Sequence, residues 1–253
     1  MVFLLLSSTT AFSFGQDNDP PAGESFADPG GDGDLSAEQS QQAARSKEGL
    51  RSVMASLIPG GVDDGTERQQ KLDLAIEAFL VGDFTQTLQR MKQFNADDAD
   101  VPPAELLMAS LVFAAGDNAN GMGLLERCAI DHPNDPGVFM SFAQLAVNSK
   151  RLTDAQALIE KAGSLINSDT MSVVAQDFYK ARYYKLFATL NLHRGNYDRA
   201  ESEIQQLATL TTNPAEALTL EAELAFKREQ YDRSLAALRK IEALPDSTGR
   251  ADL

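Results

Sequence analysis

The stretch LHRGNYDRA spans residues 192–200 and lies between two amphipathic segments. Gly195 can adopt the positive φ that ends one helix, and Asp198 can cap the next helix. A similar stretch, FKREQYDRSL, spans residues 226–235, which is 34 residues further along the chain. A period of 34 residues holds one helix, a turn and a second helix. The chain is therefore predicted to contain repeated helical hairpins.

The same phase extends in both directions from Gly195, which we place at position 15 of a 34-residue unit. Units then begin at residues 68, 102, 136, 181 and 215. Position 8 is small in every unit, as close helix packing requires: Ala75, Ala109, Ala143, Ala188 and Ala222. Position 24 is large and apolar in every unit, which favours packing against the partner helix: Met91, Leu125, Ile159, Ile204 and Leu238.

These positions resemble the tetratricopeptide repeat (TPR) family, which has a small residue at position 8, Ala at position 20 and Pro near position 32. Ala155 and Ala200 occupy position 20 of their units, and Pro133 lies at position 32 of the second unit. The resemblance covers residues 68–248 and implies an all-α, right-handed solenoid of helical hairpins. An unrelated helical bundle is the alternative.

The period is broken once, because the third and fourth units start 45 residues apart, at residues 136 and 181. The 11 additional residues, TMSVVAQDFYK at 170–180, correspond to about three helical turns. Either Ser168 or Asp169 is the expected N-cap. We expect a first helix of about 25 residues in the fourth unit, projecting past its neighbours.

The chain begins with an apolar run followed by small residues, which is typical of a signal peptide over residues 1–15 that is cut before Gln16. This run is too short to span a membrane. We expect an exported protein, periplasmic or extracellular, if the signal is genuine, and a cytoplasmic one otherwise.

Residues 16–67 are predicted to form an acidic linker that contains one helix. Residues 16–35 are rich in Pro, Gly and Asp and cannot bury enough surface to order themselves. A capping box at Ser36 then begins a helix over residues 37–58. The apolar stripe of this helix can cover the first unit or the open end of another molecule, and comprises Leu50, Val53, Met54, Leu57 and Ile58.

The net charge of −15 argues against nucleic-acid binding, because no Lys/Arg stripe is present to neutralise phosphates. Asp28, Asp32 and Asp34 resemble the start of a calcium loop, but two ligand positions lack a suitable side chain. Cys128 and His132 are four residues apart, yet Cys128 falls at a core position, so a buried thiol is expected. The sequence gives no catalytic signature. We therefore expect no metal, no cofactor and no enzyme activity.

In the family that the chain resembles, first helices line a concave groove through positions 2, 5, 9, 12 and 13. The residues there form an apolar trough in the first three units: Leu72, Ile76, Phe79, Leu106, Phe113, Met140, Gln144 and Val147. The last two units are more polar at these positions: Arg182, Lys185, Thr189, Leu192, His193, Thr219, Glu223, Phe226 and Lys227. Leu72 and Ile76 stand where some family members carry the Lys and Asn of a carboxylate clamp. Tyr179 and Tyr183 are further candidate anchors.

These observations favour a protein–protein interaction adaptor that holds a partner peptide or helix in the groove. A structural subunit that assembles through the repeat ends, and an accessory or regulatory domain of a separate enzyme, are the alternatives. The last helix should leave an open apolar face, which predicts weak self-association through this C-terminal face: Leu235, Leu238, Ile241 and Leu244.

Overall fold

The computed structural model describes residues 37–62, 65–166 and 171–244, with side chains from residue 46 onward. In these ranges all regular secondary structure is helical. The helices are α1 (Ala37–Ala55), α2 (Glu67–Leu80), α3 (Phe84–Asp97), α4 (Ala104–Ala114), α5 (Asn118–Asp131), α6 (Pro136–Asn148), α7 (Leu152–Ile166), α8 (Val173–Arg194), α9 (Tyr197–Leu210), α10 (Pro214–Lys227) and α11 (Tyr231–Glu242). The signal-peptide and calcium-loop segments lie outside the described residues.

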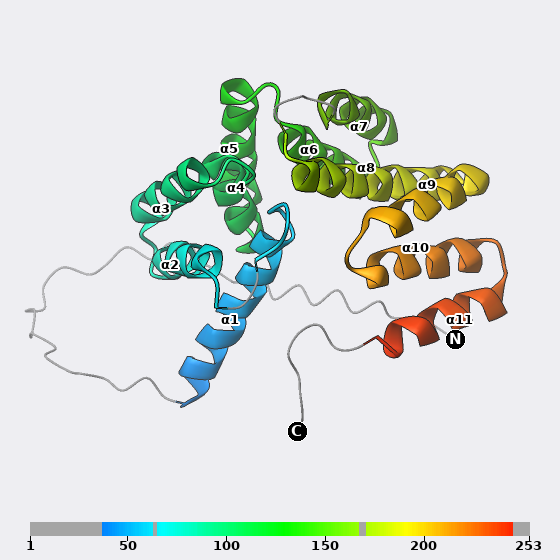
Figure 1. The fold of residues 1–253 in the computed structure, drawn as a ribbon, viewed down its shortest axis with the longest axis horizontal. Helices are drawn as coiled ribbons and strands as arrows, with labels where there is room; N and C mark the ends of the chain where they lie inside the picture. Colours follow the sequence, from blue (N-terminus) through cyan, green and yellow to red (C-terminus); the bar gives the residue numbers. More distant parts are fainter. Residues whose placement is uncertain (1–36, 63–64, 167–170, 245–253) are drawn as a thin grey trace, which may run out of the picture.

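Consecutive helices from α2 to α11 pair into hairpins 1 to 5, which confirms the predicted helical hairpins (Figure 1). The hairpins follow one another in an arc, and α1 lies on the open side of this arc against α2 and α4. The chain is therefore an all-α solenoid of TPR-like hairpins. No helix in the described ranges is long and apolar enough to cross a membrane.

The hairpin turns show why the 34-residue period is visible in the sequence. Gly195 ends α8 with a φ of 74°, as predicted. Asp83 and Asp117 are the N-caps of the second helices in hairpins 1 and 2, where their carboxylates accept backbone N–H groups. In hairpin 4 the equivalent N-cap is Asn196, so the prediction of Asp198 as the cap is wrong. Asp198 lies in the first turn instead and accepts a hydrogen bond from Arg228.

The helix phase is confirmed by burial. All five alanines at position 8 are at most 5% exposed. At position 24, Met91, Leu125, Ile159 and Ile204 are at most 6% exposed, whereas Leu238 is 43% exposed. Leu238 differs because, within the described residues, no hairpin packs on this face of hairpin 5.

The long helix α8 contains 22 residues, and Ser172 is its N-cap. The predicted caps, Ser168 and Asp169, lie outside the described residues. The prediction that the additional turns project past their neighbours is wrong. Ser172 Oγ donates to Asp100 Oδ2 at 2.6 Å, in the loop between α3 and α4. The loop that carries Asp100 joins hairpins 1 and 2. The start of α8 therefore links hairpin 4 to the N-terminal half of the array.

Candidate partner-binding surface

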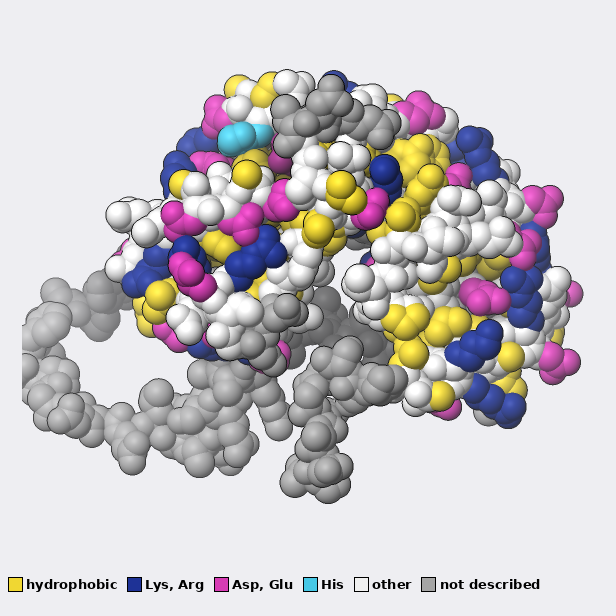
Figure 2. Space-filling model, viewed as in Figure 1, with side chains coloured by type: hydrophobic (Ala, Val, Ile, Leu, Met, Phe, Trp, Pro, Cys, Tyr) yellow, Lys and Arg dark blue, Asp and Glu magenta, His cyan; other side chains and the backbone are white. Residues whose placement is uncertain are grey.

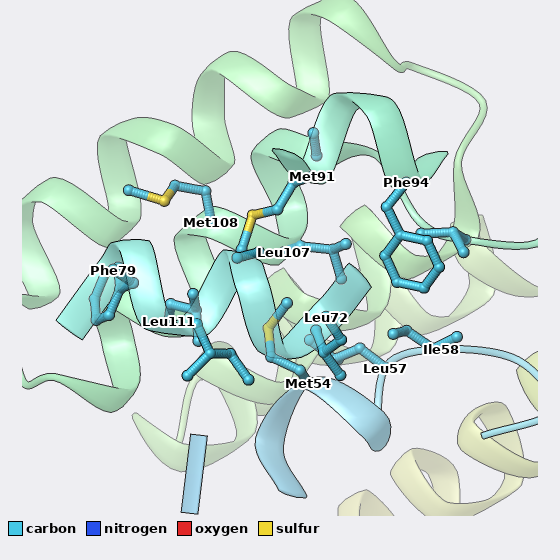
Figure 3. Close-up of a cluster of buried hydrophobic side chains, with 14 of the residues drawn as sticks. Met54, Leu57, Ile58, Leu72, Phe79, Met91, Phe94, Leu107, Met108 and Leu111 are labelled. Atoms are coloured by element: carbon cyan, nitrogen blue, oxygen red, sulfur yellow. The ribbon is translucent and has the colours of Figure 1, made fainter. Parts of the chain in front are cut away.

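The groove of hairpin 1 is filled by the chain's own helix α1 and the turn after it. Met54 and Ile58 are completely buried in one apolar cluster with Leu72 of α2 (Figure 3), and Ile76 of α2 belongs to the same cluster. The helix ends at Ala55 rather than Ile58, and a turn carries Leu57 and Ile58 into the same cluster. The prediction that Leu72, Ile76 and Phe79 line an open trough is therefore wrong.

Charged side chains fix α1 across α2. Arg51 Nε and Nη2 each donate to one carboxylate oxygen of Asp73 at 2.9 Å. Lys47 Nζ lies 2.7 Å from Glu77 Oε1. A two-pronged guanidinium–carboxylate pair fixes orientation as well as distance. These contacts show that α1 serves this chain's own first hairpin.

Most of the predicted trough in hairpins 2 and 3 is also closed. Leu106 and Met140 are at most 1% exposed, and Val147 is 2% exposed, because these helices are covered by the neighbouring hairpins. Phe113 is half-buried, and its ring lies against Gly121, where a Cβ would come within 2.8 Å of the ring. The apolar trough predicted along Leu72, Leu106, Phe113 and Met140 is therefore not an open surface.

On α6, α8 and α10 the accessible side chains at the predicted groove positions form a polar stripe. Figure 2 shows one face of the molecule, on which hydrophobic side chains lie among charged and other polar ones. Helical spacings of three and four residues place the stripe's side chains on one face of each helix, opposite buried side chains. We call this set the polar stripe: Gln144, Asn148, Arg182, Lys185, Thr189, His193, Thr219, Glu223, Phe226 and Lys227. Leu192, which was predicted with this group, is only 2% exposed and belongs to the core between α8 and α9.

Neighbouring side chains order the polar stripe. Lys185 Nζ lies 3.0 Å from Glu216 Oε1, which joins α8 to α10. Gln144 Nε2 donates to Asn148 Oδ1 at 2.9 Å. The Thr189 hydroxyl donates to the carbonyl of Lys185, one turn earlier on the same helix. The stripe therefore presents a mixture of donors and acceptors held on rigid helices.

An aromatic pair lies at the far end of the stripe. Phe226 and Tyr231 are 58% and 59% exposed, and their ring centroids are 5.8 Å apart in an edge-to-face arrangement. Exposed aromatic pairs supply apolar contact area together with a polar tip. Sequence reasoning missed Tyr231 and Asn148 as site residues, although Asn148 stands at position 13 of its unit, one of the groove positions.

Arg182 is the most unusual side chain of the stripe. Its Nη1 is buried and has no hydrogen-bond partner within the described part of the chain. Its guanidinium carbon lies 5.8 Å from the centroid of the Phe178 ring. Burial lowers the pKa of Arg182, while the nearby Tyr179, Asp135 and Glu216 act in the opposite direction. A buried guanidinium with an unused donor is a candidate site for an incoming acceptor group.

The surroundings of Arg182 correct the prediction that Tyr179 is an exposed anchor. Tyr179 is only 4% exposed, so it is not an anchor, and burial raises its pKa strongly. Tyr183 is half-buried and stacks edge-to-face on Phe187. Asp135 caps α6 by accepting from the Val138 amide at 3.1 Å, and burial raises the pKa of its carboxyl. Arg182 therefore lies near the carboxyl of Asp135, and burial makes that carboxyl harder to ionise.

A pocket of about 350 Å³ lies where α9 meets α10 and α11. Its wall is apolar, including Ile204 and Leu224, and its rim is charged. Arg233 Nη2 lies 2.9 Å from Glu201, and Arg233 Nε lies 3.3 Å from Glu221. Glu221 stands at position 7, where other hairpins place a bulky apolar residue, so the seam between hairpins 4 and 5 is incompletely filled.

The lone cysteine is a core residue, as predicted. Cys128 is completely buried, and burial is the main cause that raises the pKa of its thiol to about 12. His132 Nε2 lies 3.8 Å from Glu105 Oε2 rather than pairing with the thiol. Among the described residues, no group of three His, Cys, Asp or Glu side chains is placed to hold a metal ion.

No protein-family model and no curated protein sequence matches the chain. Solved structures that are similar to it include the following three. One is TTC0263, a thermophilic TPR protein of Thermus thermophilus, with 18% identity and a TM-score of 0.46 over 71% of this chain and 93% of that one. The others are a mutant form of MamA and MamA of AMB-1, each with 19% identity and a TM-score of 0.40. These cover 72% and 74% of this chain, and 100% and 94% of theirs.

Proposed function

We propose that the chain is a non-catalytic adaptor that binds an extended segment of a partner protein along the polar stripe, with Arg182 holding an acidic side chain of that segment. The observation that carries this proposal is the buried, unused Nη1 donor of Arg182. An unsatisfied buried donor costs roughly 1–3 kcal/mol. A carboxylate supplied by a partner would remove that cost and form a charge-assisted hydrogen bond once the half-buried Arg182 side chain turns Nη1 toward the surface.

The rest of the stripe suits a polar ligand better than an apolar helix. Gln144, Thr189 and Thr219 offer donors and acceptors for the backbone of an extended peptide. Phe226 and Tyr231 offer an aromatic platform at the end of the stripe. The apolar groove positions that would hold an amphipathic helix are already buried, as described above. An extended peptide with one acidic residue is therefore the ligand class that fits.

The test uses short labelled peptides of Gly, Ser and Ala that carry one central Glu, titrated into the full chain and followed by fluorescence anisotropy. Removing a hydrogen bond to a charged group costs about 1.5–3 kcal/mol, so Arg182→Gln should weaken binding roughly tenfold or more. Lys180→Gln, on the same helix but outside the stripe, is the matched control and should bind like the wild type. Equal affinity for Arg182→Gln and the wild type, with unchanged thermal melts, would refute the proposal.

An accessory subunit of a separate enzyme would use the same stripe, and the identity of the captured protein distinguishes that role from a general adaptor.

Export is part of the proposal because residues 1–15 have the pattern of a signal peptide. Mass spectrometry of the protein from the exported fraction should give Gln16 as the mature N-terminus. Recovery of the full-length chain from the cytoplasm alone would exclude export.

A further inference from the structure

Each internal seam of the array joins two unlike faces. The second helix of one hairpin contributes position 24, and the first helix of the next hairpin contributes position 7. Met108, Phe142 and Phe187 occupy position 7 of hairpins 2, 3 and 4, and each belongs to the same apolar cluster as residues of the preceding hairpin's second helix. The seam is thus a repeated interface between a first-helix face and a second-helix face.

The two ends of the array expose the unpaired halves of this seam. At the N-terminal end Leu74 occupies position 7 of α2 and is 46% exposed. At the C-terminal end Leu238 occupies position 24 of α11 and is 43% exposed, with Leu235 beside it at 47%. Helix α1 binds α2 through Asp73 and Glu77 and leaves Leu74 half-exposed. At the internal seams positions 7 and 24 are buried, except that Phe142 at position 7 of hairpin 3 is half-buried and Glu221 stands at position 7 of hairpin 5.

We infer that the chain stacks head to tail on a second copy of itself, with α11 of one copy packing on α2 of the next. The two exposed faces are equivalent to the two sides of the internal seam, so this contact continues an interface that the chain already makes. Pairing α11 with itself would instead join two like faces. A contact between unlike faces leaves one free face at each end of the assembly. Further copies can therefore add to it unless the rotation between neighbouring copies closes a ring.

Charges are compatible with the same arrangement, although the two equivalent residues are both cations. Across the seam between hairpins 1 and 2, Lys92 at position 25 lies 3.0 Å from Glu105 at position 4. At the ends of the array the equivalent residues are Arg239 of α11 and Lys71 of α2. The Lys71 amine lies 2.8 Å from each of the Glu67 and Asp97 carboxylates, so Arg239 would meet a cluster with one positive and two negative charges. A contact of α11 with itself would bring the two copies of Arg239 and Lys240 together.

The inference is tested with variants that block one end each, measured by light scattering across a concentration series. The wild type should show a mass that rises with concentration, and Ile130→Glu, which changes an exposed apolar residue away from both ends, should behave in the same way. Leu74→Glu and Leu238→Glu should each remain monomeric alone. Mixed together they should form a dimer and nothing larger, because each retains one intact end.

Three outcomes would overturn the inference: a wild type that stays monomeric at high concentration, a Leu74→Glu variant that still self-associates, or a mixture that remains monomeric. Thermal melts of both variants establish that they fold. A second measurement does not depend on a buried charge. Leu74→Cys mixed with Leu238→Cys should give a heterodimeric disulfide on mild oxidation, whereas cross-linking of Leu238→Cys only to itself would show a tail-to-tail contact instead.

Discussion

Arg51 and Asp73 form a two-pronged ion pair that holds α1 across the first hairpin, with both N···O distances at 2.9 Å. The two side chains are about one-fifth exposed, so solvent screens the pair only in part. Met54 and Ile58, in the same segment, bury its apolar face. The ion pair therefore positions a helix whose apolar face closes the groove.

Loss of this pair should loosen α1. We expect Arg51→Ala to lower the free energy of unfolding by about 1–2 kcal/mol, because Asp73 loses both guanidinium donors in a partly buried position. Chemical denaturation gives the difference. Arg51→Asp combined with Asp73→Arg should recover part of the loss, and a double variant no better than the single one would show that the pair does not position α1.

Two glycines of α5 provide a matched comparison of helix propensity and packing. A Cβ on Gly123 would meet nothing within 4 Å, whereas a Cβ on Gly121 would lie 2.8 Å from the Phe113 ring. Gly123→Ala should stabilise the chain by up to about 1 kcal/mol, because Ala is the better helix former. Gly121→Ala should lose that gain and destabilise the chain, since the half-buried ring must move. Thermal melts that rank the two variants in the opposite order would contradict this account.

Ala200 tests the close approach of α8 and α9. It stands at position 20 of its unit and is completely buried. Ala200→Leu should destabilise the chain by about 1–3 kcal/mol, because a bulky side chain in a packed helix crossing forces strain. Ala236→Leu places the same side chain at an exposed position of α11 and should leave the melting temperature nearly unchanged. An unchanged melting temperature for Ala200→Leu would show that this crossing is loosely packed.

The hairpins were predictable because their determinants are local. Glycine at position 15 of three units and alanine at position 8 of all five recur at a fixed spacing, and the backbone and packing requirements act within one unit. The groove was not predictable in the same way. The apolar stripe that ends in Met54 and Ile58 is visible in the sequence, but nothing local shows that it packs onto Leu72 and Ile76. The same applies to Ser172, whose contact with Asp100 joins residues 72 positions apart.

Glu201 links α9 to the last hairpin and makes part of the stability depend on pH. Hydrogen bonds from Arg228 first, and then from Arg233, hold the pKa of Glu201 below its ordinary value of 4.5. A carboxyl whose pKa is lower in the folded state stabilises the fold above its unfolded pKa, and that contribution is lost as the pH falls through the folded pKa. The Glu201 side chain is 27% exposed, so we expect a contribution of less than about 1 kcal/mol.

Denaturation curves between about pH 3 and about pH 7, a range that includes the ordinary carboxyl pKa, should show a smaller loss of stability on acidification for Glu201→Gln than for the wild type. Glu229→Gln, an exposed change in the turn before α11, serves as the control and should follow the wild-type curve. Parallel curves for Glu201→Gln and the wild type would show that the Arg228 and Arg233 contacts with Glu201 do not stabilise the folded chain.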